Sequence, residues 1–221
     1  MILPRITDVN HVNVAAGPGT LITMTRRELI AIGPVLAVAG CSSAPEPKVE
    51  VKPPEPVTGL HALYGMYTYA RTWAQDLQVV SCVSIAITQV KAVPGKAAAW
   101  QATFASPSLG QKRTYTSSVF DASPSLRSGI FADGATALTT DTRPFVLAGA
   151  RTDTDQAWET ALKHGEAFNT KNPGMIISFI LELSRTRNEP VWRVIWGENP
   201  AASSLAIVID AATGEYVQTL T

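Results

Sequence analysis

The side chains with the greatest capacity for covalent or metal chemistry are few and widely spaced in this 221-residue chain. There is no Cys-x-x-Cys pair and no His-Glu-x-x-His motif, so neither a zinc framework nor a set of structural disulfides is expected. A buried structural thiol is the expectation for Cys82, which lies in the alternating apolar stretch VVSCVSIAI without an obvious base. Two histidines fall in predicted helices and are expected on their surfaces. The candidates considered are Cys41, Cys82, His11, His61 and His164.

Cys41 has the most informative neighbourhood. An arginine pair precedes the apolar run LIAIGPVLAVAG, residues 29–40, which is too short for a membrane span and ends in small residues directly before the cysteine. This arrangement resembles a bacterial lipoprotein signal, in which the chain is cut before the cysteine and its nucleophilic thiol receives a lipid. The residues that carry the resemblance are Arg26, Arg27, Val38, Ala39, Gly40 and Cys41.

The resemblance implies a leader and signal peptide over residues 1–40, with Met24 a possible true start, and covalent diacylglycerol and N-acyl lipid on Cys41. No other cofactor is expected. It also implies attachment to a bacterial membrane on the periplasmic or exterior side. Residues 25–30 resemble a twin-arginine signal as well, so the export route stays open. The alternative is a buried helix ending near Gly40, with Cys41 as a small core residue.

Residues 41–57 predict a tether between this anchor and the rest of the chain. Its segment 44–57 combines prolines with alternating charges, which keeps a chain extended and solvated. Acidic and basic residues number 18 each over the whole chain, so no net positive field favours nucleic acid as a partner.

The C-terminal part, residues 151–221, predicts one helix followed by strands. Asp153 and Gln156 form a candidate capping pair, and apolar residues then recur at helical spacing up to Asn172-Pro173-Gly174. The segments MIISFILELSR, VWRVIWGE, LAIVID and EYVQTL follow as strands. A turn is expected at Asp210–Gly214, where the carboxylate can accept backbone amides and glycine can adopt a positive φ.

Residues 58–150 predict the same order of elements. A helical stripe runs from Leu60 to Leu77, and an alternating strand includes Cys82. The segments AWQATFAS and TYTSSVFDA then parallel the later strands, with Trp100 matching Trp192 and Asp121 matching Asp210. The expected fold is therefore α+β, with two helix-plus-antiparallel-meander units after the signal peptide and linker.

The segment VIDAATGEYV, residues 208–217, resembles the closing hairpin of PepSY-like domains, whose architecture is also cystatin-like. The resemblance covers about 70 residues of the second unit, and it implies a non-catalytic module linked with peptidase inhibition or with ligand and partner binding. The first unit lacks the Thr-Gly turn of this hairpin.

Aromatic residues are the candidates for a binding surface, namely Tyr64, Trp73, Trp192 and Trp196. The alternative for the same residues is core packing between helix and sheet. The sequence thus predicts no enzyme and no metal site, but an envelope lipoprotein that binds a protein, peptide or small ligand. A periplasmic peptidase inhibitor is the alternative, and an unrecognised hydrolase a further one.

Overall fold

The computed structural model describes residues 55–220. The first half holds helix α1, Gly59–Ala70, and five strands. These are β1 (Gln78–Ile85), β2 (Ala99–Ser106), β3 (Gln111–Ser118), β4 (Gly129–Ala132) and β5 (Thr136–Ala137). The second half holds α2, Thr154–Lys171, with β6 (Ile177–Leu183), β7 (Pro190–Trp196), β8 (Leu205–Asp210) and β9 (Tyr216–Leu220). Short 3-10 turns, η1 (Leu147–Gly149) and η2 (Pro200–Ala202), lie in connections. The predicted α+β class is confirmed.

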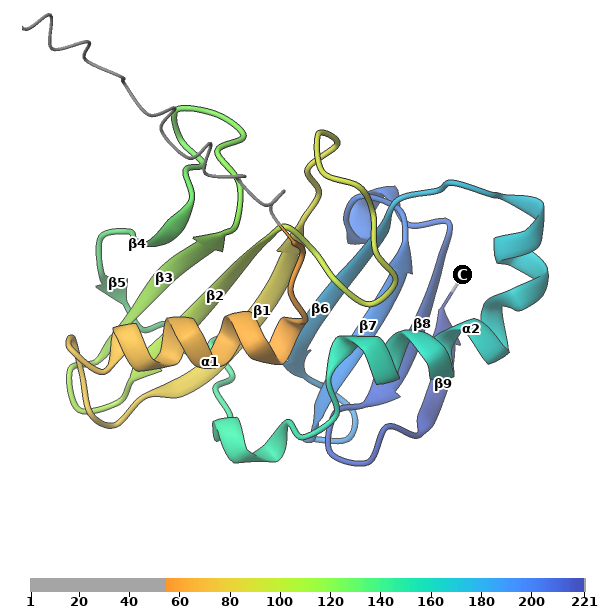
Figure 1. Ribbon diagram of the computed structural model, residues 1–221. Coiled ribbons are helices and arrows are strands. Elements are labelled where there is room, and N and C mark those ends of the chain that lie inside the picture. Colours follow the sequence, from red (N-terminus) through yellow and green to blue (C-terminus); the bar gives the residue numbers. More distant parts are fainter. Residues whose placement is uncertain (1–54, 221) are drawn as a thin grey trace, which may run out of the picture. The chain divides into compact units, whose positions relative to one another are not determined.

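The two meanders form one continuous antiparallel sheet in the order β4-β3-β2-β1-β6-β7-β8-β9, with β5 paired to β3 (Figure 1). The halves join where β1 pairs with β6, in the register Cys82↔Leu181 and Val83↔Ile180. Sequence patterns alone do not show this joint. β1 and β6 pair because each would otherwise be an open sheet edge with unpaired backbone groups, and their pairing removes both edges.

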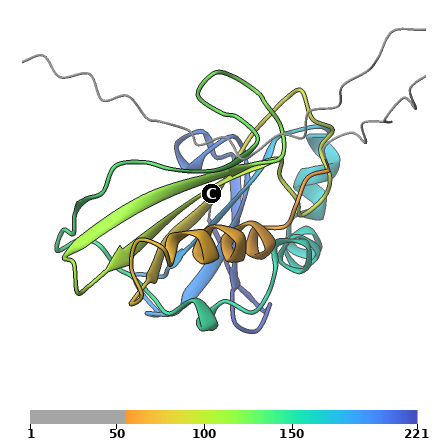
Figure 2. The ribbon, with the colours of Figure 1, turned by 60° about the vertical axis from the view of Figure 1, so that its left-hand side comes forward.

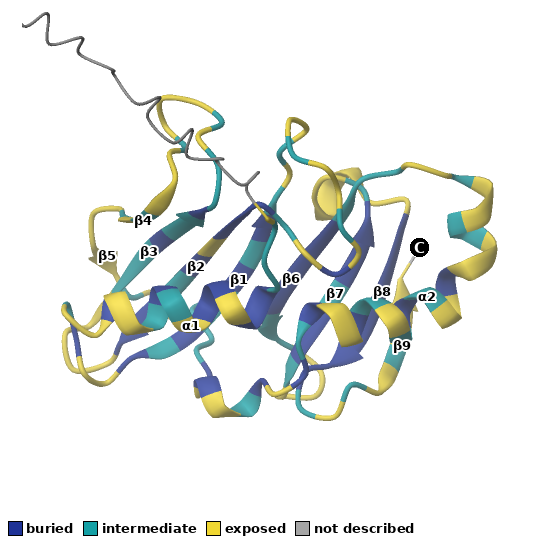
Figure 3. Cartoon of the chain, viewed as in Figure 1, coloured by how far each residue is buried: buried dark blue, intermediate teal, exposed yellow. Residues whose placement is uncertain are grey.

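Both helices lie across the same face of this sheet, and turning the molecule keeps them on that side (Figures 1 and 2). α1 places Leu60, Leu63, Met66 and Ala70 against the strands, while its outer face is exposed (Figure 3). These residues recur at i, i+3 and i+4, which is the spacing of a helix with one apolar side. One core cluster beneath both helices contains Trp100, Phe104, Trp192, Trp196 and Ile207, among others.

α1 is shorter than its apolar stripe predicts. The helix ends at Ala70, and the buried Ala74 and Leu77 belong to the connection that follows. Side chains that follow the helix donate hydrogen bonds to the carbonyl groups at its end. The Thr72 hydroxyl donates to Tyr69 O, and the Gln75 amide donates to Arg71 O. These bonds satisfy the orphan carbonyls of the last turn and end the helix without glycine or proline.

The strand registers relate the two halves by an approximate two-fold axis. Trp100 of β2 pairs with Ser84 of β1, and Trp192 of β7 pairs with Leu181 of β6, so Ser84 and Leu181 occupy equivalent positions. One residue earlier along each strand are Val83 and Ile180, and these two residues pair with each other across the joint. A residue paired with its own equivalent marks the axis, which therefore passes through the Val83–Ile180 pair.

The tryptophan equivalence extends to hydrogen bonds. The Trp100 indole donates to Val57 O at 3.1 Å and the Trp192 indole donates to Thr152 O at 2.8 Å. Each acceptor lies two residues before the first residue of the helix in the same half. The predicted match of Trp100 with Trp192 is confirmed.

The predicted match of Asp121 with Asp210 is wrong. Trp100 pairs with Ser117 across β2–β3, and Trp192 pairs with Ile209 across β7–β8, so the residue equivalent to Asp210 is Ser118. Ser118 also performs the equivalent bond, because its hydroxyl accepts the Phe120 amide as the Asp210 carboxylate accepts the Ala212 amide. The two side chains each hold the amide two residues ahead, so a hydroxyl replaces a carboxylate at the same place.

Candidate functional site

The residues expected to direct export and lipidation lie outside the described residues. These are Arg26, Arg27, Val38, Ala39, Gly40 and Cys41. Among residues 55–220, no helix is both long and apolar enough to cross a bilayer.

The structure does not bring the four candidate aromatic residues together in one surface. Trp192 and Trp196 are fully buried, whereas Tyr64 is 48% exposed and Trp73 is half-buried. Alternate residues of β7 face the helices, so both tryptophans enter the core, where their indole groups donate to Thr152 O and to Asn169 Oδ1. Core packing is therefore their role in the fold, and the interpretation of Trp192 and Trp196 as an exposed groove is wrong.

The candidate nucleophile and metal ligands are also separate. Cys82 is completely buried, and burial raises the pKa of its thiol far above the ordinary value. His61 is exposed on α1, and His164 on α2 stacks on Tyr216 with 3.9 Å between ring centroids. Within the described residues, no three side chains of the ligand types His, Cys, Asp and Glu gather as a metal site would require. His11 lies outside this range.

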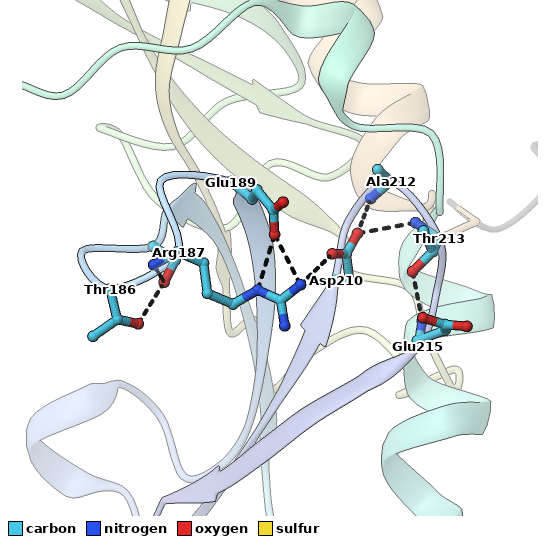
Figure 4. Close-up of polar contacts among 8 residues, drawn as sticks. Thr186, Arg187, Glu189, Asp210, Ala212, Thr213 and Glu215 are labelled. Atoms are coloured by element: carbon cyan, nitrogen blue, oxygen red, sulfur yellow. Dashed lines mark hydrogen bonds and ion pairs between the residues drawn. The ribbon is translucent and has the colours of Figure 1, made fainter.

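The Asp210 turn forms as the sequence predicts. The Asp210 carboxylate accepts the amides of Ala212 and Thr213 at 2.8 and 3.0 Å, and Gly214 has a φ of 79° (Figure 4). Arg187 donates to Asp210 at 3.4 Å and pairs with Glu189 at 2.8 Å. Every contact of the carboxylate thus serves the β8–β9 and β6–β7 turns, and it is a structural group at the end of the sheet.

The two helix N-termini meet at Asp153 and Thr154, near the centre of the fold. Asp153 caps α2 through the Thr154 amide at 2.7 Å and also accepts the Leu60 amide of α1 at 2.8 Å. The Thr154 hydroxyl accepts the Gly59 amide at 2.8 Å and donates to Gly95 O at 2.5 Å. The predicted cap at Asp153 is confirmed, but its bonds go to these amides and to no group of Gln156. The two side chains therefore fasten α1, α2 and the β1–β2 connection at one point.

The β1–β2 connection also forms one wall of a cleft with a volume of about 520 Å³. Thirteen residues separate β1 from β2, whereas the equivalent β6–β7 connection has six. The longer connection passes over the α2–β6 junction, where Trp158 and Asn169 of α2 form part of the wall. The cleft therefore arises because the β1–β2 connection is longer than the β6–β7 connection that is its two-fold equivalent.

One end of this connection is anchored. Gly95 has a φ of 71° and lies so close to the Asp155 backbone that a larger residue would collide with it. Val57 and Ala97 exchange two backbone hydrogen bonds of 3.0 Å, which fix the connection beside the start of α1. The anchors hold residues 95–97 in place, and the preceding residues form the outer wall of the cleft.

The cleft is lined mainly by apolar side chains. They come from the β1 end and its connection and from the start of β6, and they include Ile85, Ile87, Val90, Met175, Ile177 and Phe179. Lys91 and Lys96 are exposed lining residues, and neither forms an ion pair with another described residue. The cleft is therefore a hydrophobic cavity with positive charge at its rim, within the size range of small-molecule sites.

Sequence reasoning missed this cleft. The turn at residues 93–96 is visible in the sequence and forms, with a backbone bond from Lys96 N to Val93 O. The signal that could have located the cleft is the unequal length of two connections that otherwise occupy equivalent positions. Recognising it requires the strand register, which the sequence alone does not supply.

A second hollow, of about 280 Å³, has a mixed polar lining. Lys112, Arg143 and Arg185 contribute positive charge, and Asp141 and Glu182 contribute negative charge. Glu182 is also paired with Arg193 at 2.9 Å. Because side chains of opposite charge are mixed in its lining and its volume is smaller, this hollow is the weaker candidate.

Comparisons with known proteins give no family for this chain. No protein-family model matches it, and no curated protein gives a significant match. Among solved structures, a "putative lipoprotein" from Clostridium difficile 630 is similar, with 10% sequence identity and a TM-score of 0.48. The likeness covers 75% of this chain and 94% of that one. It is a distant resemblance in fold outline.

Proposed function

We propose that this protein is a lipid-anchored, non-catalytic module of a bacterial envelope that binds an apolar ligand in the cleft beneath the β1–β2 connection. The observation that carries the binding role is the cleft itself, which has an apolar lining and a volume of about 520 Å³. Pockets of this kind are the usual small-molecule sites of proteins, and their few polar groups orient the ligand. An apolar side chain of an envelope peptide or protein partner would use the same cavity.

Within residues 55–220, the arrangement of the candidate catalytic residues supports a non-catalytic role. The described nucleophile and histidines lie apart: Cys82 is in the core, and His61 and His164 are exposed on different helices. None of the three lines the cleft. A reaction centre needs such groups within hydrogen-bond reach of one another and of a substrate, so their separation supports binding over catalysis.

The ligand test uses the unlipidated full chain, Cys41→Ser, and the neutral fluorescent probe N-phenyl-1-naphthylamine. We expect saturable binding that Ile87→Asp weakens at least tenfold, because this half-buried lining residue would bring a carboxylate into the cavity. The matched control is Val146→Asp, since Val146 is 64% exposed and does not line the cleft. Equal loss in both variants, or no saturable binding at all, would refute the site.

The anchor is tested separately in a bacterial host. Labelled palmitate should enter the wild-type protein, and the protein should sediment with membranes. Cys41→Ser should abolish both, because serine lacks the thiol that would carry the lipid. The matched control is Cys82→Ser, which removes the other of the two cysteines and should leave labelling intact. Labelling of the Cys41→Ser variant would overturn the anchor assignment and leave the ligand test unaffected.

A further inference from the structure

The polar side chains that line the cleft offer hydrogen-bond donors but no carboxylate. The lining includes Ser84, Asn169, Lys91 and Lys96, and neither aspartate nor glutamate. The charged side chains of the lining are therefore all positive, which favours an anionic ligand. The following inference rests on the proposed function and narrows its ligand class.

The orientation of the Asn169 amide is fixed by its neighbour. The Trp196 indole is only a donor, and it donates to Asn169 Oδ1 at 3.1 Å. The oxygen must therefore face Trp196, and the NH₂ group is the end left to donate elsewhere. No acceptor for this NH₂ group is found within residues 55–220. Asn169 lines the cleft, so its NH₂ group is a candidate donor to a bound ligand.

Ser84, on strand β1, supplies a second candidate hydrogen-bond donor to the cleft. Its hydroxyl oxygen accepts the Phe179 amide at 2.9 Å, across the β1–β6 joint. The side chain is 7% exposed and lines the cleft, and no described residue accepts its hydroxyl hydrogen. A buried hydroxyl with a satisfied oxygen and an available hydrogen is a donor that awaits an acceptor.

We propose that the cleft binds a free fatty acid, a carboxylate on a single long acyl chain. The carboxylate accepts hydrogen bonds from these donors and is attracted by the ammonium groups of Lys91 and Lys96, while the chain lies against the aliphatic and aromatic lining. Thr88 also lines the cleft and its hydroxyl can donate, whereas no lining side chain is anionic. The volume of about 520 Å³ suits a ligand of drug size with one chain.

The experiment compares laurate with dodecanol, which has the same chain length and no charge. Binding to the full-length Cys41→Ser protein is measured by calorimetry below the micelle concentration. We expect Lys91→Gln with Lys96→Gln to weaken laurate binding by about two- to thirtyfold, as for two exposed ion pairs, and to leave dodecanol binding unchanged. The matched control is Lys163→Gln with Lys171→Gln, which removes the same charge from exposed α2 positions outside the cleft.

Chain length gives a second readout. Each added methylene between octanoate and laurate should tighten binding by up to about fourfold, because each one buries further apolar surface. Brominated laurate should quench the fluorescence of Trp158, the one tryptophan among the described lining residues. Val146→Asp should preserve both effects, and Ile87→Asp should remove both.

The outcomes separate the two proposals. If dodecanol binds as tightly as laurate and the lysine variants change neither, the cleft is a neutral apolar site and the fatty-acid assignment is wrong. If neither compound binds, the fatty-acid assignment fails, and the naphthylamine result then decides whether the binding role fails with it. Lysine-dependent binding to phosphatidylglycerol vesicles without binding of free laurate would assign the charges to a bilayer and overturn the inference.

Discussion

Replacing Gly59 by alanine tests the junction where the two halves meet. A Cβ at this position would lie 2.6 Å from Trp192 Cη2, 2.7 Å from Thr154 Cγ2 and 3.1 Å from Trp100 Cη2. Two of these distances are too short for carbon atoms, and the rings are fixed by the indole bonds to Val57 O and Thr152 O. Overpacking of a core costs about 1–3 kcal/mol, while alanine in place of glycine would favour a helix by up to about 1 kcal/mol. We therefore expect a net loss of about 1–2 kcal/mol.

Gly65→Ala is the matched control within the same helix. Its added Cβ would meet only Ile130 Cδ1, at 3.7 Å, which is an ordinary contact. Here the gain in helix propensity should dominate and stabilise the protein by about 0.5–1 kcal/mol. Urea denaturation followed by far-ultraviolet circular dichroism measures both variants, and the slope with denaturant should remain that of the wild type. A Gly59→Ala protein as stable as Gly65→Ala would refute the packing described at the junction.

Three further predictions concern the same unit. Asp153→Ala should cost about 1–3 kcal/mol in urea denaturation, because one carboxylate caps α2 and also binds the Leu60 amide of α1; Asp153→Asn should restore most of the loss. The pKa of Asp76 is held below its ordinary value of 3.8, first by the Ser106 hydroxyl and then by a backbone amide, so its contribution is present above pH 3.8 and is lost as the pH falls through the folded-state pKa. Stability measured against pH should therefore fall less steeply below 3.8 in Asp76→Asn, and an unchanged slope would contradict the argument. Because burial raises the pKa of the Cys82 thiol, the folded Cys41→Ser protein should resist iodoacetamide at pH 8 and react only in urea; rapid labelling of the folded protein would show that Cys82 is accessible.

Local patterns predicted the elements that depend on local chemistry. β2 and β8 coincide with the segments AWQATFAS and LAIVID, because short runs of β-branched, aromatic and other apolar residues between turns favour extended strands. All six residues of β8 are buried, as its continuous apolar run indicates. The Asp210 turn was also predictable, since a carboxylate bonding the amides ahead of it and a glycine at positive φ are local requirements. In contrast, the sequence identified Trp192 and Trp196 as large aromatic residues on one strand face but did not decide whether that face was covered.

The candidate site depended on relations that no short segment contains. Ser84, Asn169 and Lys91 lie on β1, on α2 and in the β1–β2 connection, and they line one cleft only because β1 pairs with β6. The aromatic candidates were chosen for residue type, whereas the cleft arises from the length of a connection relative to its two-fold equivalent. A sequence shows residue types directly. Which residues of the two halves lie close together depends on the register of the β1–β6 pairing, which the sequence does not show.

The amino-acid sequence by itself predicted a lipoprotein signal, which lies outside the described residues. It also determined the alternation that makes strands, the apolar stripes that make helices and the repeated order of elements in two halves. Only the tertiary structure decided that the halves share one sheet, that Asp153 and Thr154 fasten both helices, and that the longer connection passes over α2 to leave a cavity. The physical reason is that periodicity and turn chemistry act between residues a few positions apart. Strand pairing across about 100 residues is chosen instead by the cost of open edges and by packing in a shared core.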